Sequence, residues 1–360
     1  MRRLEGLFIN CLKAQDSIYE SGKMVFQCLS GSDSFSLDYI EVEKDQRTVP
    51  GRYDFYFFNY HISTMAWLDT KAIKSLLPGI TMTIVLEVSP NDPFVCCSPD
   101  DFEVYCVLDP TMDVDLQNVF AFPRPLEEYD VTFGIEESDV PVIGSFGFAT
   151  QGKGFEQLVE AVNKEFDRAV VRLNIPPSTY ADKDGIFSRQ LAENCRAIAR
   201  PGIELLVTHD YMTKPELIEW CRQNTINCFL YDRNMPGLAA TTDQAISSGK
   251  PLLVSNNETF RHIHRYLRPY PEQSLKDAIT YSRPYVDKMK EDWSPLNFRK
   301  CFEKVLNGLE FSETKTDTDT VELKVVRPDS VSYIQRLRNK VAIRSTIRSL
   351  VKSFVNKAPE

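Results

Sequence analysis

Short apolar runs alternate with segments of helical spacing along most of this 360-residue chain. In the first third, three runs have the composition of strands buried on both faces of a sheet: 53–59, 80–88 and 104–108. Helical spacing at 63–77 separates the first two runs and ends before Pro78-Gly79. This order of strands and a helix predicts an open parallel sheet in the N-terminal part.

From Val140 onward the alternation is more regular. Apolar runs predict strands at 141–148, 169–175, 204–208, 227–231 and 251–255. Between these strands, the spacing predicts helices at 155–166 and 187–199, from Thr213 onward, and at 240–248. Regular strand–helix alternation predicts a doubly wound parallel sheet, so the whole chain is expected to be an α/β protein.

Composition narrows the class of protein. Apolar residues make up 42% and charged residues 26%, the balance of a soluble globular protein. No apolar run has the length of a membrane span, and the N-terminus lacks the pattern of a signal peptide. We therefore expect a cytoplasmic location. The net charge of −9 argues against a nucleic-acid partner.

The C-terminal segment is an exception to this acidic balance. Residues 321–360 contain nine Lys or Arg and three acids, and their apolar residues from Ile334 to Phe354 fall at helical spacing. They predict a basic amphipathic tail, which follows a polar linker at 312–320. One interpretation is a helix on the inner, anionic membrane surface, where each base contributes about 1 kcal/mol. The other is a helix packed on the acidic body or on a second subunit.

The cysteines do not predict a metal or redox site. There are nine, without a Cys-x-x-Cys pair, and only four histidines. For the adjacent Cys96 and Cys97, burial as small hydrophobic residues is favoured over metal binding. We assign no metal ligands from the sequence.

The first candidate site is the glycine-rich segment 144–154 (GSFGFATQGKG), between a predicted strand and helix. Glycines let a backbone approach a ligand closely, and the N–H groups at a helix start favour an anion. Lys153 adds a charge suited to a diphosphate. The segment matches neither a Walker loop nor the dinucleotide fingerprint. A tight turn with a solvent-facing lysine is the alternative, and the segment alone does not decide between them.

Two further segments follow predicted strands at the edge where α/β sheets bind ligands. In the first, Pro236-Gly237 forms a turn, and Asp243 lies in the next helix. In the second, Asn256 or Asn257 can cap a helix, whereas Arg261 can reach a phosphate. For Asp243, a solvated helix acid is the competing interpretation.

The order of these segments resembles the donor domain of GT-B glycosyltransferases of the retaining, family-4-like bacterial group. The resemblance covers about 140–263. Matching positions fall on Gly147 and Lys153 and on Gly249-Lys250-Pro251. It implies two Rossmann-like domains facing a cleft, and transfer of a sugar from a nucleotide diphosphate sugar without metal or cofactor.

The chain departs from the family pattern at the charged positions. The family arginine that pairs with the donor phosphates aligns with Phe148. The two glutamates of the Glu-x7-Glu motif align with Pro236 and Gln244. Gln244 can still bind ribose hydroxyls, Asp243 can supply an acid and Arg261 can replace the arginine. These gaps leave the donor's identity open.

In the N-terminal half, two polar residues stand at the ends of predicted strands. His61 can act as a base or orient an acceptor hydroxyl, and a histidine capping the next helix is the alternative. Glu87 interrupts an apolar strand, so it either faces a ligand or needs a partner.

Together these features predict a glycosyltransferase that acts on a glycan or lipid-linked glycan in surface polysaccharide or glycoconjugate synthesis. The candidate catalytic residues are His61, Glu87 and Asp243, and the candidate donor-binding residues are Gly147, Phe148, Lys153, Gly237, Gln244, Asn256 and Arg261. A non-catalytic, glycan-binding or scaffold module of the same fold is the competing hypothesis. The expected segments are an acceptor domain at 1–138, a donor domain at 139–290, a helix crossing back at 291–311, the linker at 312–320 and the tail at 321–360.

Overall fold

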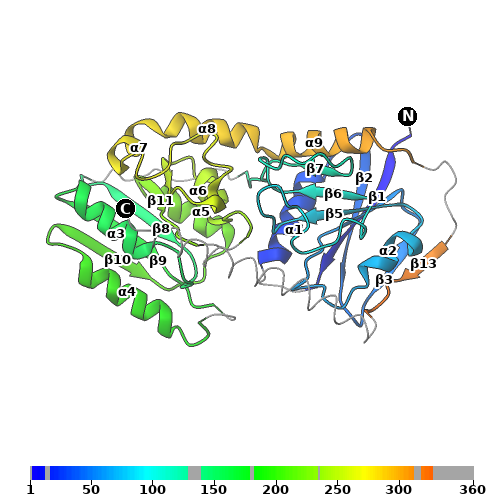
Figure 1. Ribbon diagram of the computed structural model, residues 1–360, viewed down its shortest axis with the longest axis horizontal. Coiled ribbons are helices and arrows are strands. Elements are labelled where there is room, and N and C mark those ends of the chain that lie inside the picture. The colour runs from blue at the N-terminus through cyan, green and yellow to red at the C-terminus, as the bar shows by residue number, and fades with distance from the viewer. Residues whose placement is uncertain are drawn as a thin grey trace, which may run out of the picture. The chain divides into compact units, whose positions relative to one another are not determined.

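The computed structural model describes residues 2–12, 17–128, 139–178, 182–233, 236–311 and 318–326. They form two compact units, each built around a parallel β-sheet (Figure 1). The first unit contains the described residues of Met1–Pro125, Pro236–Leu238 and Pro295–Glu360, and the second those of Leu126–Met235 and Ala239–Ser294. The division after Pro125 therefore falls earlier than the boundary expected at 138.

The sheet of the first unit is parallel throughout. Its strand order is β2 (Phe35–Val42), β1 (Leu4–Cys11), β4 (Phe55–Phe58), β5 (Ile80–Val85), β6 (Val104–Val107) and β7 (Val119–Ala121). The predicted strands at 53–59, 80–88 and 104–108 coincide with β4, β5 and β6. The first two strands were not predicted, because Glu5, Ser36 and Asp38 interrupt their apolar runs.

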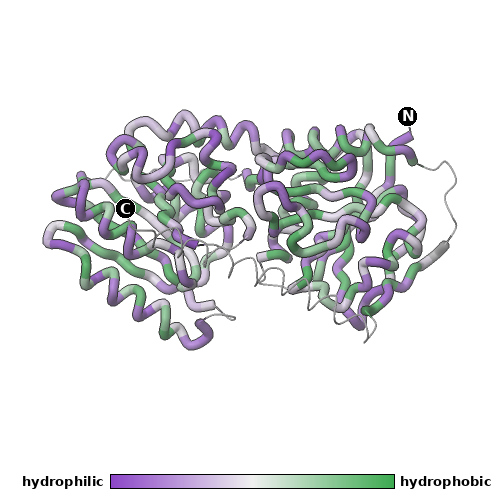
Figure 2. The backbone as a smooth tube through the Cα atoms, in the orientation of Figure 1, coloured by the Kyte–Doolittle hydropathy of each residue, from purple (hydrophilic) through white to green (hydrophobic). Residues whose placement is uncertain are grey.

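Strand β4 shows why this sheet needs helices on both faces. Phe55 and Phe57 point into one core, which also receives side chains from α1 (Ser17–Leu29) and α9 (Pro295–Asn307). Tyr56 and Phe58 point into the opposite core, beneath α2 (Thr70–Leu76). Because successive strand residues alternate between faces, an all-apolar strand is stable only when both faces are covered. Figure 2 shows the corresponding concentration of hydrophobic residues in the strands.

Residues 318–322 differ from the sequence-based expectation of a linker leading into a helical tail. They form strand β13 (Thr318–Glu322), which pairs antiparallel with β3 (Thr48–Gly51). Val321 and Leu323 are buried in the core of the first unit. The pairing with β3 and the burial of these two apolar side chains decide the conformation here. The predicted helical tail lies, from residue 327, outside the described residues.

The second unit is a doubly wound sheet, as the sequence predicted. Its parallel strand order is β10 (Ile203–Thr208), β9 (Ala169–Asn174), β8 (Val142–Phe146), β11 (Ile226–Phe229) and β12 (Leu252–Val254). One core packs beneath α3 (Phe155–Glu165), α4 (Ile186–Ile198) and α7 (Leu275–Tyr281). The other packs beneath α5 (Lys214–Arg222), α6 (Thr241–Ser247) and α8 (Arg283–Asp292).

Both sheets contain a point where the strand order reverses. In the second unit the chain proceeds from β8 outward to β10 and then returns to the other side of β8 with β11. In the first unit the same reversal lies between β1 and β4. Open α/β sheets bind ligands outside the carboxyl ends of the strands at such points. Among the described helices, none has both the length and the apolar character needed to cross a bilayer.

We predict that Phe302→Ala strongly destabilises the first unit. Phe302 of α9 is fully buried, and its ring lies 5.0 Å from that of Phe57 and 5.4 Å from that of Phe35. Removing such a side chain costs about 3–5 kcal/mol of unfolding free energy. Leu296→Ala, in the same helix but 53% exposed, is the control and is expected to change stability by less than about 0.5 kcal/mol. Urea unfolding followed by circular dichroism measures both, and equal effects would contradict the packing of α9 on this core.

Candidate functional site

The glycine-rich loop after β8 packs directly against the backbone that follows β11. Gly152 and Gly154 have φ angles of 78° and 73°, which favour glycine. A Cβ on Gly154 would lie 1.9 Å from the carbonyl oxygen of Leu230, and one on Gly152 would lie 2.7 Å from that of Asp232. The Asp232 amide donates to the Gly152 carbonyl at 2.9 Å. Two segments that the sequence analysis treated separately therefore meet at the β8–β11 reversal.

Lys153 and Tyr231 are the residues that this approach brings together. The Lys153 ammonium donates to the Tyr231 hydroxyl at 3.0 Å and lies 4.4 Å from the centre of its ring. The Tyr231 hydroxyl also lies 2.9 Å from Thr241 Oγ1, at the start of α6. The lysine is thus held at the carboxyl edge of the sheet, whereas a solvent-facing turn was the alternative interpretation.

Arg233 is a second cation beside the Tyr231 ring, and it was not among the residues predicted from the sequence. Its guanidinium lies 5.9 Å from the centre of the Tyr231 ring and donates to Thr259 Oγ1 at 3.1 Å. The Asn257 side chain donates to the Arg233 carbonyl at 2.9 Å. Arg233 stands two residues after the predicted strand at 227–231, and this position could have indicated a ligand-binding residue from the sequence. Within the described part of the chain, neither Lys153 nor Arg233 has an acidic partner.

Of the remaining donor-site candidates, Gly147 lies beside Lys153 and Tyr231: a Cβ there would lie 3.6 Å from Lys153 Nζ and 3.7 Å from the Tyr231 hydroxyl. Gly147, with a φ of 145°, is held through its amide by the Asn174 carbonyl at 3.0 Å, and Phe148 and Gln244 are half-buried. Asn256 is exposed after β12. The Arg261 guanidinium donates to the Glu258 carbonyl at 3.0 Å. Asn257 caps the short helix at Glu258–Phe260, which confirms the capping interpretation for that residue.

Asp243 and Gly237, two of the predicted site residues, lie in surroundings that differ from those expected from the sequence. Asp243 lies in the first turn of α6 and is only 4% exposed, so the solvated position considered for it is wrong. Gly237 belongs to the first unit, where its amide donates to the Val88 carbonyl at 2.9 Å. Its φ is 91°, and a Cβ there would lie 3.6 Å from Glu87 Cγ.

His61 and Glu87, the two candidates of the first unit, lie side by side. His61 follows β4 and Glu87 follows β5, and these strands are parallel neighbours whose carboxyl ends share one edge. His61 Nε2 is 3.4 Å from Glu87 Oε2. Cys96, which the sequence analysis assigned to the core, is buried as expected but also donates its thiol proton to Glu87 Oε2 at 3.2 Å. We call these three residues the His61–Glu87–Cys96 cluster.

The protonation of this cluster follows from its burial and contacts. Burial, and then the Glu87 carboxylate, raise the pKa of the Cys96 thiol well above its ordinary value, so the thiol keeps its proton. The Ser63 amide donates to His61 Nδ1 at 3.1 Å when that nitrogen carries no proton, and Nε2–H then faces Glu87. Glu87 is the accessible member, with a side chain 39% exposed against 8% for His61.

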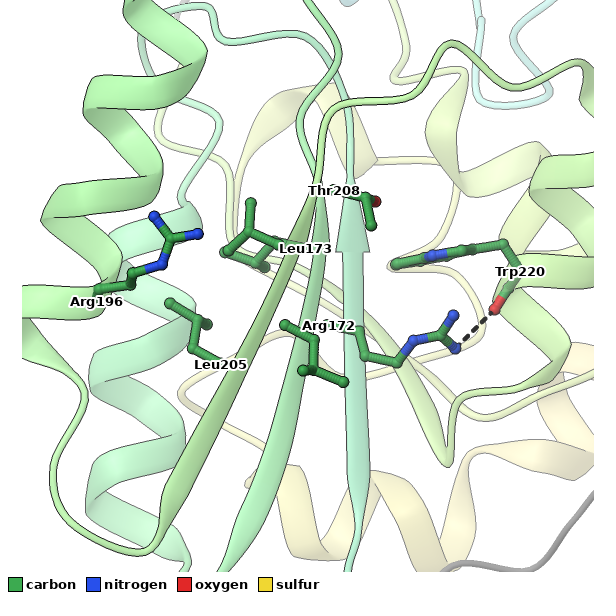
Figure 3. Close-up of a pocket in the computed structure, with 8 residues that line it drawn as sticks. Arg172, Leu173, Arg196, Leu205, Thr208 and Trp220 are labelled. Carbon is green, nitrogen blue, oxygen red and sulfur yellow. Dashed lines mark hydrogen bonds between the residues drawn. The ribbon is translucent and has the colours of Figure 1, made fainter.

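A pocket of the second unit lies beside strands β9 and β10 (Figure 3). It is lined mainly by residues from the carboxyl-terminal halves of these two strands and by Trp220 of α5. Arg172 stacks at 4.8 Å on the Trp220 ring and donates to Asn224 Oδ1 at 2.8 Å. The Arg172 guanidinium is satisfied within the protein, and none of the lining residues belongs to β8, to β11 or to the loops that meet at their reversal. We therefore do not consider this pocket the functional site.

Comparison with known proteins identifies the fold. No protein-family model and no curated protein matches the sequence. Solved structures do: HepE of Anabaena (Alr3699) in complex with UDP and glucose superposes with a TM-score of 0.57 and 9% identity, covering 85% of this chain and all of HepE. The trehalose-6-phosphate synthase OtsA superposes with a TM-score of 0.58 and 9% sequence identity, covering 86% of this chain and all of OtsA. The lipopolysaccharide outer core galactosyltransferase WaaB superposes with a TM-score of 0.53 and 11% sequence identity, covering 85% of this chain and all of WaaB.

These similarities show a GT-B glycosyltransferase fold, which confirms the predicted class of two Rossmann-like sheets. At 9–11% identity they do not extend to the family-4-like subtype or its motif, which stay predictions from the sequence.

We predict that Gly154→Ala destabilises the second unit more than Gly249→Ala. Both glycines have φ near 70°, where any other residue costs about 1–2 kcal/mol. Only at Gly154 would the Cβ collide with backbone, and such overpacking adds about 1–3 kcal/mol. At Gly249 the nearest atom is the flexible Lys290 Nζ, at 3.6 Å. Urea unfolding compares the two variants, and equal losses would mean that the loops do not approach as closely as described.

Proposed function

We propose that this protein transfers a sugar from a nucleotide diphosphate sugar to a hydroxyl of a glycan or lipid-linked glycan. The observation that carries the proposal is the pair of cations, Lys153 and Arg233, on the Tyr231 ring at the β8–β11 reversal. Two cations without an acidic partner among the described residues favour a ligand with at least two negative charges. The GT-B fold supports this class of ligand, since HepE was solved with UDP-glucose.

Lys153 and Arg233 would stabilise the diphosphate as it leaves the sugar. Charge develops on the phosphate oxygens in the transition state, and cations fixed in advance stabilise it without reorganisation. Helix α3 begins at Gly154 without a side-chain cap, so its first N–H groups add a partial positive charge. Because these groups can neutralise the diphosphate, we propose that donor binding is independent of metal. Arg233 takes the role that the sequence analysis considered for Arg261.

Glu87 is proposed to bind the acceptor hydroxyl. Its carboxylate is the exposed member of the His61–Glu87–Cys96 cluster, and the other two residues donate to it and fix its orientation. His61 is therefore a positioning residue in this proposal. The resemblance to retaining enzymes implies that the product keeps the anomeric configuration of the donor. An inverted product would instead assign Glu87 the role of general base.

We further propose a cytoplasmic enzyme of surface polysaccharide or glycoconjugate synthesis that contacts the inner membrane face. The support is the basic, amphipathic composition of 321–360 and the expected lipid-linked acceptor. The competing hypothesis, a non-catalytic module, is supported by the absence of glutamates at Pro236 and Gln244.

We predict that Lys153→Ala and Arg233→Ala each weaken donor binding about 10- to 100-fold. A hydrogen bond to a charged group contributes about 1.5–3 kcal/mol, which corresponds to that change in Kd. A thermal-shift screen of UDP, GDP, ADP and CMP and their sugar conjugates first identifies the nucleotide, and calorimetry then measures the variants. Lys164→Ala, an exposed lysine in the last turn of α3, is the matched control and should bind like wild type.

Two outcomes would count against the proposed donor site. If no nucleotide stabilises wild type, the non-catalytic module becomes the better account. If a nucleotide binds but neither variant weakens it, the ligand lies elsewhere.

We predict that Glu87→Gln lowers sugar transfer by about 100-fold or more while donor binding is retained. A positioned acid–base group contributes about 10²- to 10⁴-fold, and the amide keeps the size of the side chain but loses its charge. Nucleotide release in the presence of a glycan panel measures transfer. Asp100→Asn, an exposed acid in the loop that follows Cys96, is the control and should transfer normally. Equal activity of Glu87→Gln and wild type would remove Glu87 from the mechanism.

A further inference from the structure

The three polar atoms of the His61–Glu87–Cys96 cluster have the mutual spacing of metal ligands. His61 Nε2, Glu87 Oε2 and Cys96 Sγ all lie within 4.8 Å of one another. The separations are 3.4 Å from nitrogen to oxygen, 3.2 Å from sulfur to oxygen and 3.6 Å from sulfur to nitrogen. They come from the connections that follow β4 and β5, and the fold brings His61 of the first beside Glu87 and Cys96 of the second.

Two of these separations match a tetrahedral zinc site. Zinc binds nitrogen and oxygen at roughly 2.0–2.2 Å and thiolate sulfur at about 2.3 Å, so a tetrahedron places nitrogen and oxygen roughly 3.3–3.5 Å apart and sulfur roughly 3.5–3.7 Å from either. The nitrogen–oxygen separation of 3.4 Å and the sulfur–nitrogen separation of 3.6 Å lie in these ranges. The sulfur–oxygen separation of 3.2 Å is that of the thiol hydrogen bond, and it would lengthen by about 0.3 Å when the metal replaces the proton. One imidazole, one carboxylate and one thiolate form a donor set that suits Zn²⁺ and disfavours Mg²⁺ or Ca²⁺, which prefer oxygen ligands.

The neighbourhood of His61 supplies the support that a ligating imidazole needs. Ser63 Oγ lies 2.7 Å from His61 Nδ1 and can accept a hydrogen bond when the proton of the ring is on Nδ1. The lone pair of Nε2 is then free for a metal. In the metal-free tautomer the Ser63 amide donates to Nδ1 instead. Metal binding at Nε2 therefore moves the proton of neutral His61 from Nε2 to Nδ1, and it exchanges the hydrogen bond from the Ser63 amide for one to the Ser63 hydroxyl.

The segment that leads to Cys96 is held by local hydrogen bonds and by one ring contact. Ser89 and Asp92 exchange backbone hydrogen bonds at 3.0 and 3.1 Å, and the Phe94 amide donates to the Asp92 side chain at 3.0 Å. The Phe94 ring packs edge-on against Tyr105 at 5.1 Å. A ligand on such a segment is positioned before the metal arrives, which lowers the entropic cost of binding.

We propose that His61, Glu87 and Cys96 form a zinc-binding site in the first unit, with the fourth position open to water on the side of the partly exposed Glu87. Binding forms Zn–N, Zn–O and Zn–S bonds, and the Cys96 thiol proton passes to solvent. Three protein ligands with one open position are typical of zinc sites that bind a further small ligand. The inference goes beyond the proposed glycosyl transfer and does not depend on it.

The test is to bind Co²⁺ and then Zn²⁺ to the purified, reduced full chain. Tetrahedral cobalt with a thiolate ligand has a charge-transfer band in the near ultraviolet, so absorption reports both geometry and sulfur ligation. We expect one equivalent of Co²⁺ to produce this band, and Zn²⁺ to displace it. Elemental analysis after gel filtration checks the stoichiometry. Because no nucleotide sugar is present, a negative result here leaves the donor-binding experiments unaffected.

Variants then assign the ligands. Cys96→Ala is expected to abolish the band and weaken affinity about 100-fold or more, because loss of an outer partner alone costs 10- to 100-fold. Cys97→Ala, at the adjacent buried cysteine, should keep the band. Glu87→Gln tests a partly exposed ligand, so its weaker binding would not be explained by misfolding. Ser63→Ala should weaken affinity about 10- to 100-fold.

Three results would overturn the proposal: no saturable cobalt binding to folded wild type, binding without the thiolate band, or equal losses in the two cysteine variants. Circular dichroism confirms that each variant is folded before its affinity is compared.

Discussion

The close approach of the glycine loop to the backbone after β11 is the constraint on which the donor side of this structure depends. At Gly154 even a single methyl group would lie 1.9 Å from a carbonyl oxygen. That contact places Lys153 on the Tyr231 ring and leaves the start of α3 without a side-chain cap. Arg233 joins the same ring from the other loop. The proposed anion-binding site therefore depends on backbone packing that brings two loops together, and not on a single charged residue.

The first unit gathers its polar residues by a different route. Parallel neighbouring strands end at the same edge of a sheet, so the residues that follow β4 and β5 lie beside each other. The Glu87 carboxylate, which is partly exposed, lies beside His61 Nε2 and accepts the Cys96 thiol proton. The same geometry that satisfies the carboxylate gives the three atoms the spacing of zinc ligands. A cluster of hydrogen bonds and a metal site are thus two states that one arrangement can support.

Helix α9 and strand β13 show how late segments of the chain complete the first unit. Phe302 packs against aromatic residues of two strands, β2 and β4, and β13 adds to the short strand β3. Both segments follow the second unit in sequence. The core of the first unit therefore contains side chains from segments that precede and segments that follow the second unit in sequence.

The sequence by itself determined the α/β class, the strands of the second unit and most of those of the first, because apolar runs and helical spacing are local properties. It also placed Lys153, His61 and Glu87 at strand ends, where parallel sheets bind ligands. The tertiary structure alone decided which loops meet. It paired Lys153 with Arg233 in place of Arg261, buried Asp243, joined Gly237 to the first unit and turned Cys96 from a core residue into a partner of Glu87. It also made a strand of 318–322, where local composition predicted a linker. Contacts between residues distant in the chain depend on strand order and loop packing, and these are not encoded in any local pattern.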